Sequence, residues 1–193
     1  MVVFLDRDGV INRDRPEFVK SWAEFEFLPG VIEALARLTE AGAKIIVLSN
    51  QSCVGRGICS IETVNQINQR MSDELAKAGA HLSGVYICPH APEDGCDCRK
   101  PKPGLILKAA AELELDLEGA VVIGDDKRDL QAGRAAGLKA ILVRTGKGAA
   151  VEADPAARPD VVVDDMRAAV DLLLSEKKKE ETFLMRSSSV FPE

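Results

Sequence analysis

The chain has 193 residues, of which 46% are hydrophobic, and a formal net charge of -6. This length and apolar content fit one domain with a single sizeable core. The negative charge argues against a nucleic-acid-binding surface, because proteins that bind the phosphate backbone carry a basic patch or stripe. With no apolar run long enough to span a bilayer and no signal-peptide pattern, we expect a soluble, cytoplasmic monomer without nucleic-acid or membrane partners.

The chain opens on an apolar segment, residues 2–5, that runs directly into Asp6, Asp8 and Gly9. Such a segment predicts a buried strand that delivers carboxylates at its carboxyl end, where open α/β sheets carry their chemistry. Because side chains alternate along a strand, Asp6 and Asp8 should point the same way. A calcium loop is the alternative, but it needs glycine at its sixth position, where this chain has Ile11. The pattern therefore predicts two carboxylates that converge on one small volume.

Helical and strand patterns alternate along the rest of the chain. Apolar residues at helical spacing predict helices over residues 29–41, 62–78, 103–115, 128–136 and 166–174. Short β-rich apolar runs predict strands over residues 44–48, 84–87, 120–123, 140–143 and, at an edge, 160–163. This order predicts an α/β fold: a three-layer, Rossmann-like parallel sheet with helices on both faces and right-handed crossovers. The inserts between strands are short, so we expect no large cap domain.

Polar clusters follow four of the predicted strands. They are Asp6 and Asp8, then Ser49 and Asn50, then Arg99 and Lys100, and finally Asp125, Asp126 and Asp129. Three carboxylates from two strands make an oxygen-rich site for a hard cation, and magnesium is favoured because it accepts few protein ligands and keeps waters. Ser49, Asn50 and Lys100 would supply donors for a phosphoryl group. In the competing interpretation, Asp125 and Asp129 cap the helix that follows.

A second cluster of metal-ligand types lies between residues 88 and 98. Its members are Cys88, His90, Cys96 and Cys98. Three thiolates and one imidazole complete a tetrahedral zinc shell without an open position, which marks a structural zinc in a zinc-stabilised loop. Buried cysteines without metal are the alternative, but the intervening Pro, Asp and Gly residues make a poor core segment. The odd cysteine count fits a metal site in a reducing compartment better than a disulfide framework, so we expect Cys53 and Cys59 to pack as small apolar residues.

The set of motifs resembles the haloacid dehalogenase superfamily of phosphatases, over nearly the whole chain up to about residue 170. The resemblance implies that Asp6 attacks phosphorus and becomes an aspartyl phosphate, while Asp8 protonates the leaving alcohol and then activates water. It also implies that Ser49 binds a phosphoryl oxygen and that Lys100 steadies the nucleophile and the transferred group. Asp125 would hold magnesium together with Asp6 and the Asp8 carbonyl.

The zinc loop ahead of Arg99 narrows the resemblance to a subgroup containing the heptose 1,7-bisphosphate phosphatases and the histidinol-phosphate phosphatases. It implies magnesium-dependent removal of the C7 phosphate of a heptose bisphosphate, a small phosphorylated metabolite. A histidinol-phosphate phosphatase and a catalytically silent, zinc-stabilised binding module are the alternatives. The expected substrate-binding residues are Ser49, Asn50, Gln51, Ser52, Arg56, Arg99 and Lys100, with Asp14 and Arg15 as further candidates. The chain departs from the heptose enzymes at Cys53, where they usually place glycine, at Asp126, where they place lysine, and at Phe18, where tyrosine is usual.

The phosphatase domain implied by this resemblance comprises residues 1–175. Residues 176–193 mix charges of both signs and predict a polar, mobile C-terminal tail. The alternative is that Phe183 and its apolar neighbours dock on the core or on a partner chain.

Overall fold

The computed structural model describes the backbone of residues 1–188 and places six parallel strands in one sheet. The strands are β1 (Val2–Leu5), β2 (Lys44–Asn50), β3 (Gly84–Cys88), β4 (Val121–Gly124), β5 (Lys139–Val143) and β6 (Val161–Val163). Their spatial order is β3-β2-β1-β4-β5-β6, and every neighbouring pair is parallel. The predicted parallel α/β sheet is therefore confirmed, with β1 at its centre.

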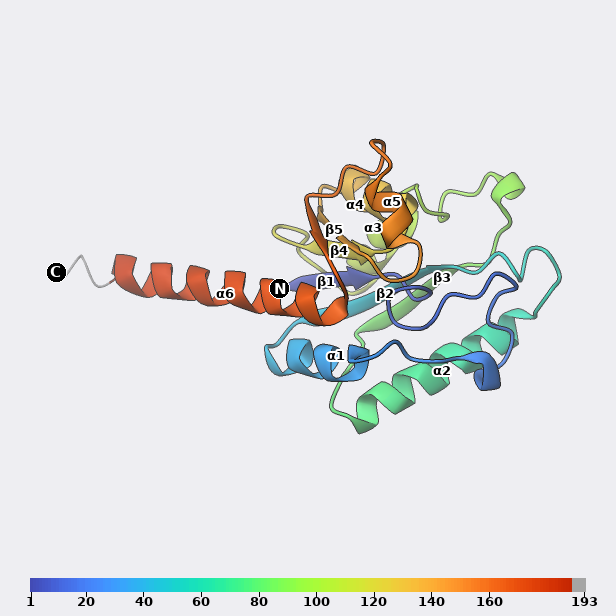
Figure 1. The fold of residues 1–193 in the computed structure, drawn as a ribbon, viewed down its shortest axis with the longest axis horizontal. Helices are drawn as coiled ribbons and strands as arrows, with labels where there is room; N and C mark the ends of the chain where they lie inside the picture. The colour runs from blue at the N-terminus through green and yellow to red at the C-terminus, as the bar shows by residue number, and fades with distance from the viewer. Residues whose placement is uncertain (189–193) are drawn as a thin grey trace.

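Helices cover both faces of the sheet (Figure 1). They are α1 (Val31–Glu40), α2 (Ile61–Lys77), α3 (Gly104–Glu112), α4 (Lys127–Ala135), α5 (Gly148–Glu152) and α6 (Met166–Ser188), with short 3-10 helices η1 (Trp22–Glu24) and η2 (Pro92–Asp94). Successive residues of β1 face opposite layers: Val3 and Leu5 pack in the core under α1, α2 and α6, and Phe4 packs in the core under α3 and α4. This alternation is what a strand buried on both sides requires.

The segment between β1 and α1 contains only the short helix η1, packs beside α2, and forms no cap domain. Trp22 stacks on Phe25 with ring centroids 4.9 Å apart, and Phe25 meets the edge of Phe27 at 5.0 Å. The guanidinium of Arg70, on α2, lies 5.6 Å from the Trp22 ring. The aromatic contacts hold the segment together, and the cation–π contact attaches it to α2. All three rings also pack against the buried core.

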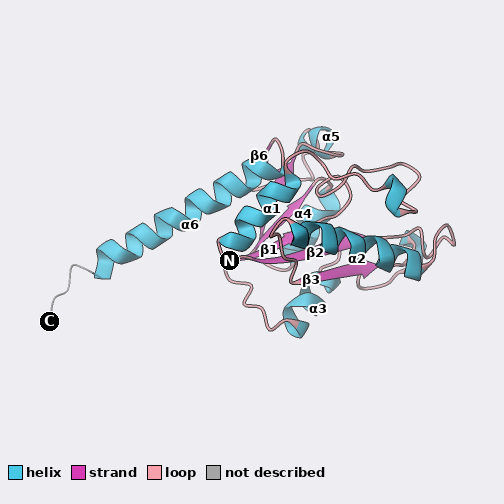
Figure 2. Cartoon of the chain, turned by 90° about the horizontal axis from the view of Figure 1, so that it is seen from below, coloured by secondary structure: helices cyan, strands magenta, loops and turns pink. Residues whose placement is uncertain are grey.

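Helix α6 is longer than its apolar periodicity predicts. The periodicity predicts an end at residue 174, whereas the structure carries the helix to Ser188, away from the body of the fold (Figure 2). Lys139 pairs with Glu176 at 2.7 Å, and Lys177 lies 3.7 Å from Glu181 one turn later. Lysine and glutamate are good helix formers and pair at this spacing, so the helix continues without an apolar face. Phe183 is 72% exposed, and residues 189–193 lie outside the described part of the chain.

The structure corrects the expectation for Cys53 and Cys59. The two residues form a disulfide, with Cα atoms 5.5 Å apart, in the loop after β2. The backbone N–H groups of Ile58 and Cys59 both donate to the Cys53 carbonyl oxygen, at 2.8 and 3.3 Å, so the loop turns back on itself. The prediction that these cysteines pack as unbonded apolar residues is therefore wrong, because hydrophobic periodicity does not reveal a tight loop.

Among residues 1–188, no helix has the combination of length and hydrophobicity that spanning a bilayer requires.

Candidate active site

The carboxyl ends of β1, β2 and β4 meet at one edge of the sheet and form a pocket of about 280 Å³. The predicted site residues that line this pocket are Asp6, Asp8, Ser49, Asn50, Gln51, Ser52, Arg99 and Lys100. Asp125 is 1% exposed and lies beneath the pocket, in contact with the same cluster. A larger hollow of about 630 Å³ lies along α1 and α6, but its described lining residues include no group of convergent carboxylates.

Lys100 is a buried cation that lines the pocket. Its Nζ lies 2.8 Å from Asp6 Oδ1 and 2.6 Å from Asp129 Oδ1, and it donates to the Leu48 carbonyl oxygen at 2.7 Å. Asn50 fixes the Lys100 backbone with two hydrogen bonds of 3.1 Å, one to its carbonyl oxygen and one from its N–H. Burial opposes the charged form, but the carboxylates of Asp129 and Asp6 raise the pKa of Lys100 above its usual range. The lysine is therefore protonated, and its position is fixed at both ends.

Three buried carboxylates share this lysine. Asp6, Asp125 and Asp129 each place an oxygen within 4.8 Å of the others. Burial, reinforced by the charge of Asp129, raises the pKa of Asp6 to about 7. Burial and the charges of Asp6 and Asp129 raise the pKa of Asp125 to about 8. When all three carboxyl groups are ionised, one lysine leaves two negative charges uncompensated, so this donor set fits a divalent cation with oxygen ligands.

Asp8 has a different environment from its neighbours. Nη2 of Arg7 lies 3.0 Å from both of its carboxylate oxygens, Asn12 donates at 2.9 Å, and Gln51 donates at 2.7 Å. Burial alone would raise the pKa of Asp8, but the charge of Arg7 and these hydrogen bonds hold it below its usual value. Arg7 is fully buried, and its Nη1 donates to Asn68 on α2 at 3.0 Å. Asp8 is therefore ionised at neutral pH and rigidly held.

Two glycines and one backbone N–H position Asp125. Gly9 and Gly146 both have positive φ, of 86° and 57°, and a Cβ built on either would lie 2.0 Å from Asp125 Oδ2. The same oxygen accepts a hydrogen bond from the Lys147 backbone N–H at 2.8 Å. Two backbone segments thus pack directly on this carboxylate, and only glycine permits that approach.

For Asp125 and Asp129, helix capping and site formation were alternatives in the sequence. In the structure Asp125 belongs to the carboxylate cluster, Asp126 is the N-cap of α4, and Asp129 has both roles. Asp126 accepts from the Arg128 N–H at 3.0 Å, and Asp129 accepts from the Asp126 N–H at 3.1 Å, which makes a capping box. Asp129 nevertheless belongs to the site, because its other oxygen pairs with Lys100. Both roles therefore coexist in the same short segment.

Some sequence expectations do not match the pocket. Arg56 is exposed and does not line the pocket, because its backbone N–H bonds the Ser52 carbonyl oxygen and turns the loop away. Asp14, by contrast, lines the pocket as expected and pairs with Lys147 at 3.0 Å.

Lys147 and Arg128 also line the pocket, although no sequence motif pointed to them. Lys147 follows β5, so the strand-end rule that found the other clusters would have found it.

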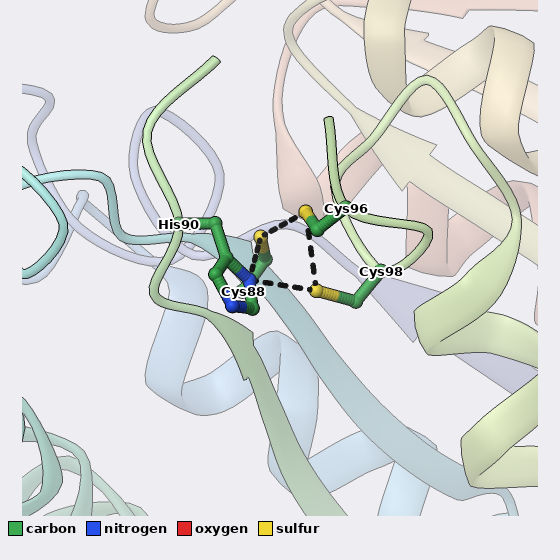
Figure 3. Close-up of side chains that lie close together, drawn as sticks. All are labelled: Cys88, His90, Cys96 and Cys98. Atoms are coloured by element: carbon green, nitrogen blue, oxygen red, sulfur yellow. Dashed lines mark hydrogen bonds between the residues drawn. The ribbon is translucent and has the colours of Figure 1, made fainter. Parts of the chain in front are cut away.

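The cysteine–histidine cluster is brought together as predicted (Figure 3). The sulfur of Cys96 lies 3.6 Å from that of Cys88 and 3.5 Å from that of Cys98. Nδ1 of His90 lies 3.7 Å from the Cys88 sulfur and 3.3 Å from the Cys98 sulfur. A tetrahedral zinc with Zn–S bonds of about 2.3 Å and Zn–N bonds of about 2.0 Å has edges of roughly 3.8 Å and 3.5 Å. The four ligand atoms therefore fit a zinc shell.

Metal-free thiols in this arrangement have perturbed acidity. Burial, together with the neighbouring Cys88 and Cys96 sulfurs, raises the pKa of Cys98 to about 12. The pKa of Cys88 is raised as well, chiefly by burial. Zinc favours the thiolate form and would offset both effects. Arg99 links this loop to the pocket, because it lines the pocket while its Nη1 donates to the His90 carbonyl oxygen at 3.2 Å.

The central β1 strand with its two aspartates, the buried lysine and the acids after β4 define a phosphatase of the haloacid dehalogenase type. A family model described as "HAD-hyrolase-like" matches residues 97–169. The D-glycero-beta-D-manno-heptose-1,7-bisphosphate 7-phosphatase of Bordetella bronchiseptica is 41% identical over 176 residues, which cover 91% of this chain and 98% of that protein. The chain belongs to the family of these 7-phosphatases and is a phosphomonoester hydrolase.

Further relatives agree with this assignment. The enzyme of the same name from Pseudomonas aeruginosa is 38% identical over 173 residues, covering 90% of this chain and 97% of that protein. The crystal structure of the D,D-heptose 1,7-bisphosphate phosphatase from B. bronchiseptica, complexed with magnesium and phosphate, superimposes with a TM-score of 0.86. That structure is 40% identical in sequence, and the match covers 91% of this chain and 98% of that one.

Proposed function

We propose that this protein removes the C7 phosphate of D-glycero-D-manno-heptose 1,7-bisphosphate in a magnesium-dependent reaction that passes through an aspartyl phosphate. The single observation that carries the proposal is the buried cluster of Asp6, Lys100, Asp125 and Asp129 at the base of an open pocket. The relatives that bear this activity in their names support the choice of substrate.

Asp6 is the proposed nucleophile. Its Oδ1 accepts from the Arg7 backbone N–H at 2.8 Å and pairs with Lys100, whereas Oδ2 makes no hydrogen bond within residues 1–188. Attack by Oδ2 would form the bond to phosphorus as the bond between phosphorus and the sugar oxygen breaks. Lys100 lies where it reduces repulsion between the ionised carboxylate and the phosphate dianion.

Asp6 and Asp125 are the proposed magnesium-binding side chains, with the Asp8 carbonyl as a further ligand. Both oxygens of Asp129 are already engaged, by Lys100 and by the Asp126 N–H, so Asp129 more readily orients the lysine than binds metal. A bound magnesium ion would neutralise the carboxylates and polarise the phosphoryl oxygens as a Lewis acid. Its charge would also stabilise the ionised forms of Asp6 and Asp125, whose pKa values are raised in its absence.

Asp8 is the proposed acid and base. The resting carboxylate is ionised, and the negative charge of a bound phosphate raises its pKa, which favours protonation before the sugar oxygen leaves. After Asp8 gives that proton to the leaving alkoxide, its carboxylate can take a proton from the water that hydrolyses the aspartyl phosphate. Gln51 bonds both Asp8 and Ser49 Oγ at 2.7 Å, and so couples this group to the proposed phosphoryl-binding serine.

The remaining proposed assignments follow from the pocket lining. Gln51, Ser52 and Arg99 line the pocket and are the proposed substrate contacts. Asn50 lines it too, but its amide is used on the Lys100 backbone, which makes it a positioning residue. Arg56 lies outside the described pocket lining, so a substrate role for it has no support. A structural zinc at Cys88, His90, Cys96 and Cys98 would fix the loop that carries Arg99 and Lys100.

Phosphate release from the heptose 1,7-bisphosphate and from histidinol phosphate, measured side by side with magnesium and with a chelator, tests the proposal. We expect strong preference for the heptose, loss of activity with the chelator, and no turnover in a folded Asp6→Asn variant. Preference for histidinol phosphate would overturn the substrate assignment and leave the chemistry intact. Turnover by Asp6→Asn would overturn the nucleophile, and inactivity on both substrates would favour a binding module.

A further inference from the structure

The proposed substrate carries two phosphate groups, and the base of the pocket accounts for one of them. Lys100 is buried against Asp6 and Asp129, where the transferred phosphoryl group would lie. The second phosphate is also anionic and needs a cationic partner nearer the pocket opening. The basic residues that line the pocket besides Lys100 are Arg15, Arg99, Arg128 and Lys147.

Arg128, in the first turn of α4, has its guanidinium oriented by a carboxylate. Its Nε lies 3.1 Å from Asp126 Oδ1, and its Nη2 lies 2.7 Å from Asp126 Oδ2. This two-point contact uses one edge of the planar guanidinium. The edge formed by Nη1 and the second Nη2 hydrogen remains available, since Nη1 makes no hydrogen bond to any residue that the structure describes. A guanidinium edge of this kind matches two phosphate oxygens.

Asp126 is itself compensated, so it does not simply repel an anion. Its carboxylate accepts the Arg128 N–H at 3.0 Å in addition to the two guanidinium bonds. Its side chain is 16% exposed and that of Arg128 is 40% exposed, so the arginine is the more accessible member of the pair. Both side chains line the pocket, and the carboxylate orients the guanidinium of the more exposed arginine.

The neighbouring cation of α4 is directed elsewhere. Lys127 Nζ pairs with Asp154 at 3.0 Å, and Lys127 does not line the pocket. Lys147 lines the pocket, but its Nζ is 3.0 Å from the carboxylate of Asp14.

Arg15 and Arg99 also line the pocket, and each donates to a backbone carbonyl oxygen, of Glu24 and His90 respectively. Arg128 is the cation whose guanidinium a pocket-lining carboxylate orients through two hydrogen bonds, with its other donor edge available.

We propose that Arg128, held by Asp126, binds the non-transferred phosphate and selects bisphosphorylated over monophosphorylated sugars. This inference rests on the proposed function, because it presupposes a sugar bisphosphate in this pocket. In this proposal Asp126 acts as a positioning residue, through the guanidinium of Arg128.

The test compares the heptose 1,7-bisphosphate with the heptose 7-phosphate, which lacks the second phosphate, in wild type, Arg128→Gln, Arg128→Lys and Lys127→Gln. We expect Arg128→Gln to lower kcat/KM for the bisphosphate by about 10- to 100-fold, the range for a lost hydrogen bond to a charged group, mainly through KM. Its kcat/KM for the monophosphate should stay within about twofold. Arg128→Lys should recover part of the loss, because it keeps the charge but not the two-point geometry.

Lys127→Gln is the matched control, because it removes one positive charge from the adjacent position outside the pocket, and it should behave as wild type. Equal loss on both substrates in Arg128→Gln would overturn the inference and assign the residue to structure or chemistry. Retention of wild-type selectivity for the bisphosphate in Arg128→Gln would overturn it while leaving the proposed function intact. Equal kcat/KM for the two sugars in wild type would overturn the inference alone, whereas no phosphate release from the bisphosphate would overturn both. Thermal unfolding of each variant is the control for retention of the fold.

Discussion

Replacing Gly146 with alanine should lower activity because the added methyl group would collide with the carboxylate of Asp125. The new Cβ would lie 2.0 Å from Asp125 Oδ2 and 2.7 Å from the Gly9 Cα, whereas real Cβ contacts stay above 3.0 Å. Asp125 or the loop must therefore move by about 1 Å. A displacement of that size in a catalytic site costs roughly 100-fold in rate. We expect at least that loss in kcat.

The same substitution should also lower the free energy of unfolding, through a backbone cost and a packing cost. Alanine at the left-handed φ of 57° costs roughly 1–2 kcal/mol, and the overpacked contact adds roughly 1–3 kcal/mol. Gly137→Ala is the matched control, because Gly137 has φ of 79° and no described atom lies within 4 Å of the position that a Cβ would occupy. It should show the backbone cost alone and retain full activity.

The assays are phosphate release at saturating substrate and denaturant unfolding of both variants beside wild type. Activity loss in Gly146→Ala together with full activity in Gly137→Ala would show that the contact with Asp125 matters. Equal activity and equal unfolding free energy in the two variants would refute the reasoning, since the two glycines would then differ only in sequence position.

Two further predictions concern the zinc loop and the buried arginine. Cys96→Ser should release zinc and lower the midpoint of thermal unfolding, because one of four ligands is lost; unchanged metal content by elemental analysis would contradict the zinc assignment. Asn68→Leu should destabilise the protein by about 1.5–3 kcal/mol in denaturant unfolding, because the buried guanidinium of Arg7 loses its acceptor. Asn65→Leu, at an exposed position one turn earlier on α2, is its control and should change stability by less than about 0.5 kcal/mol; a similar loss in both variants would show that the arginine contact is unimportant.

The strands were predictable because each is a short apolar run rich in β-branched residues. Every predicted strand overlaps an observed one with bounds that differ by two residues or fewer. Helix α5, Gly148–Glu152, was not predicted, because five residues are too few to display a helical period. The outer part of α6 was not predicted for a different reason. Its polar residues give no amphipathic pattern, although lysine and glutamate favour a helix locally.

Most of the pocket-lining residues were predictable from their position after strands, because parallel strands place their carboxyl ends along one edge of the sheet. Loop direction and arginine pairing were not predictable in the same way. Arg56 follows β2 closely in sequence, yet its loop turns away from the pocket. Arg7 and Arg128 each stand among carboxylates in sequence, and which acid an arginine meets depends on backbone dihedral angles that periodicity does not report.

The central position of β1 divides the sheet into two halves built from different parts of the chain. Strands β2 and β3 extend from one side of it, and β4, β5 and β6 extend from the other. Asp6 directly follows the middle strand, Ser49 lies in a strand of the first half, and Asp125 directly follows a strand of the second. The ladder between β1 and β4 pairs only Val3–Leu5 with Val121–Ile123. A chain cut between α3 and β4 would therefore regain phosphatase activity only as two contacts re-form: this short ladder, and the packing of α6 on α1. Turnover would then report how fast the two fragments join.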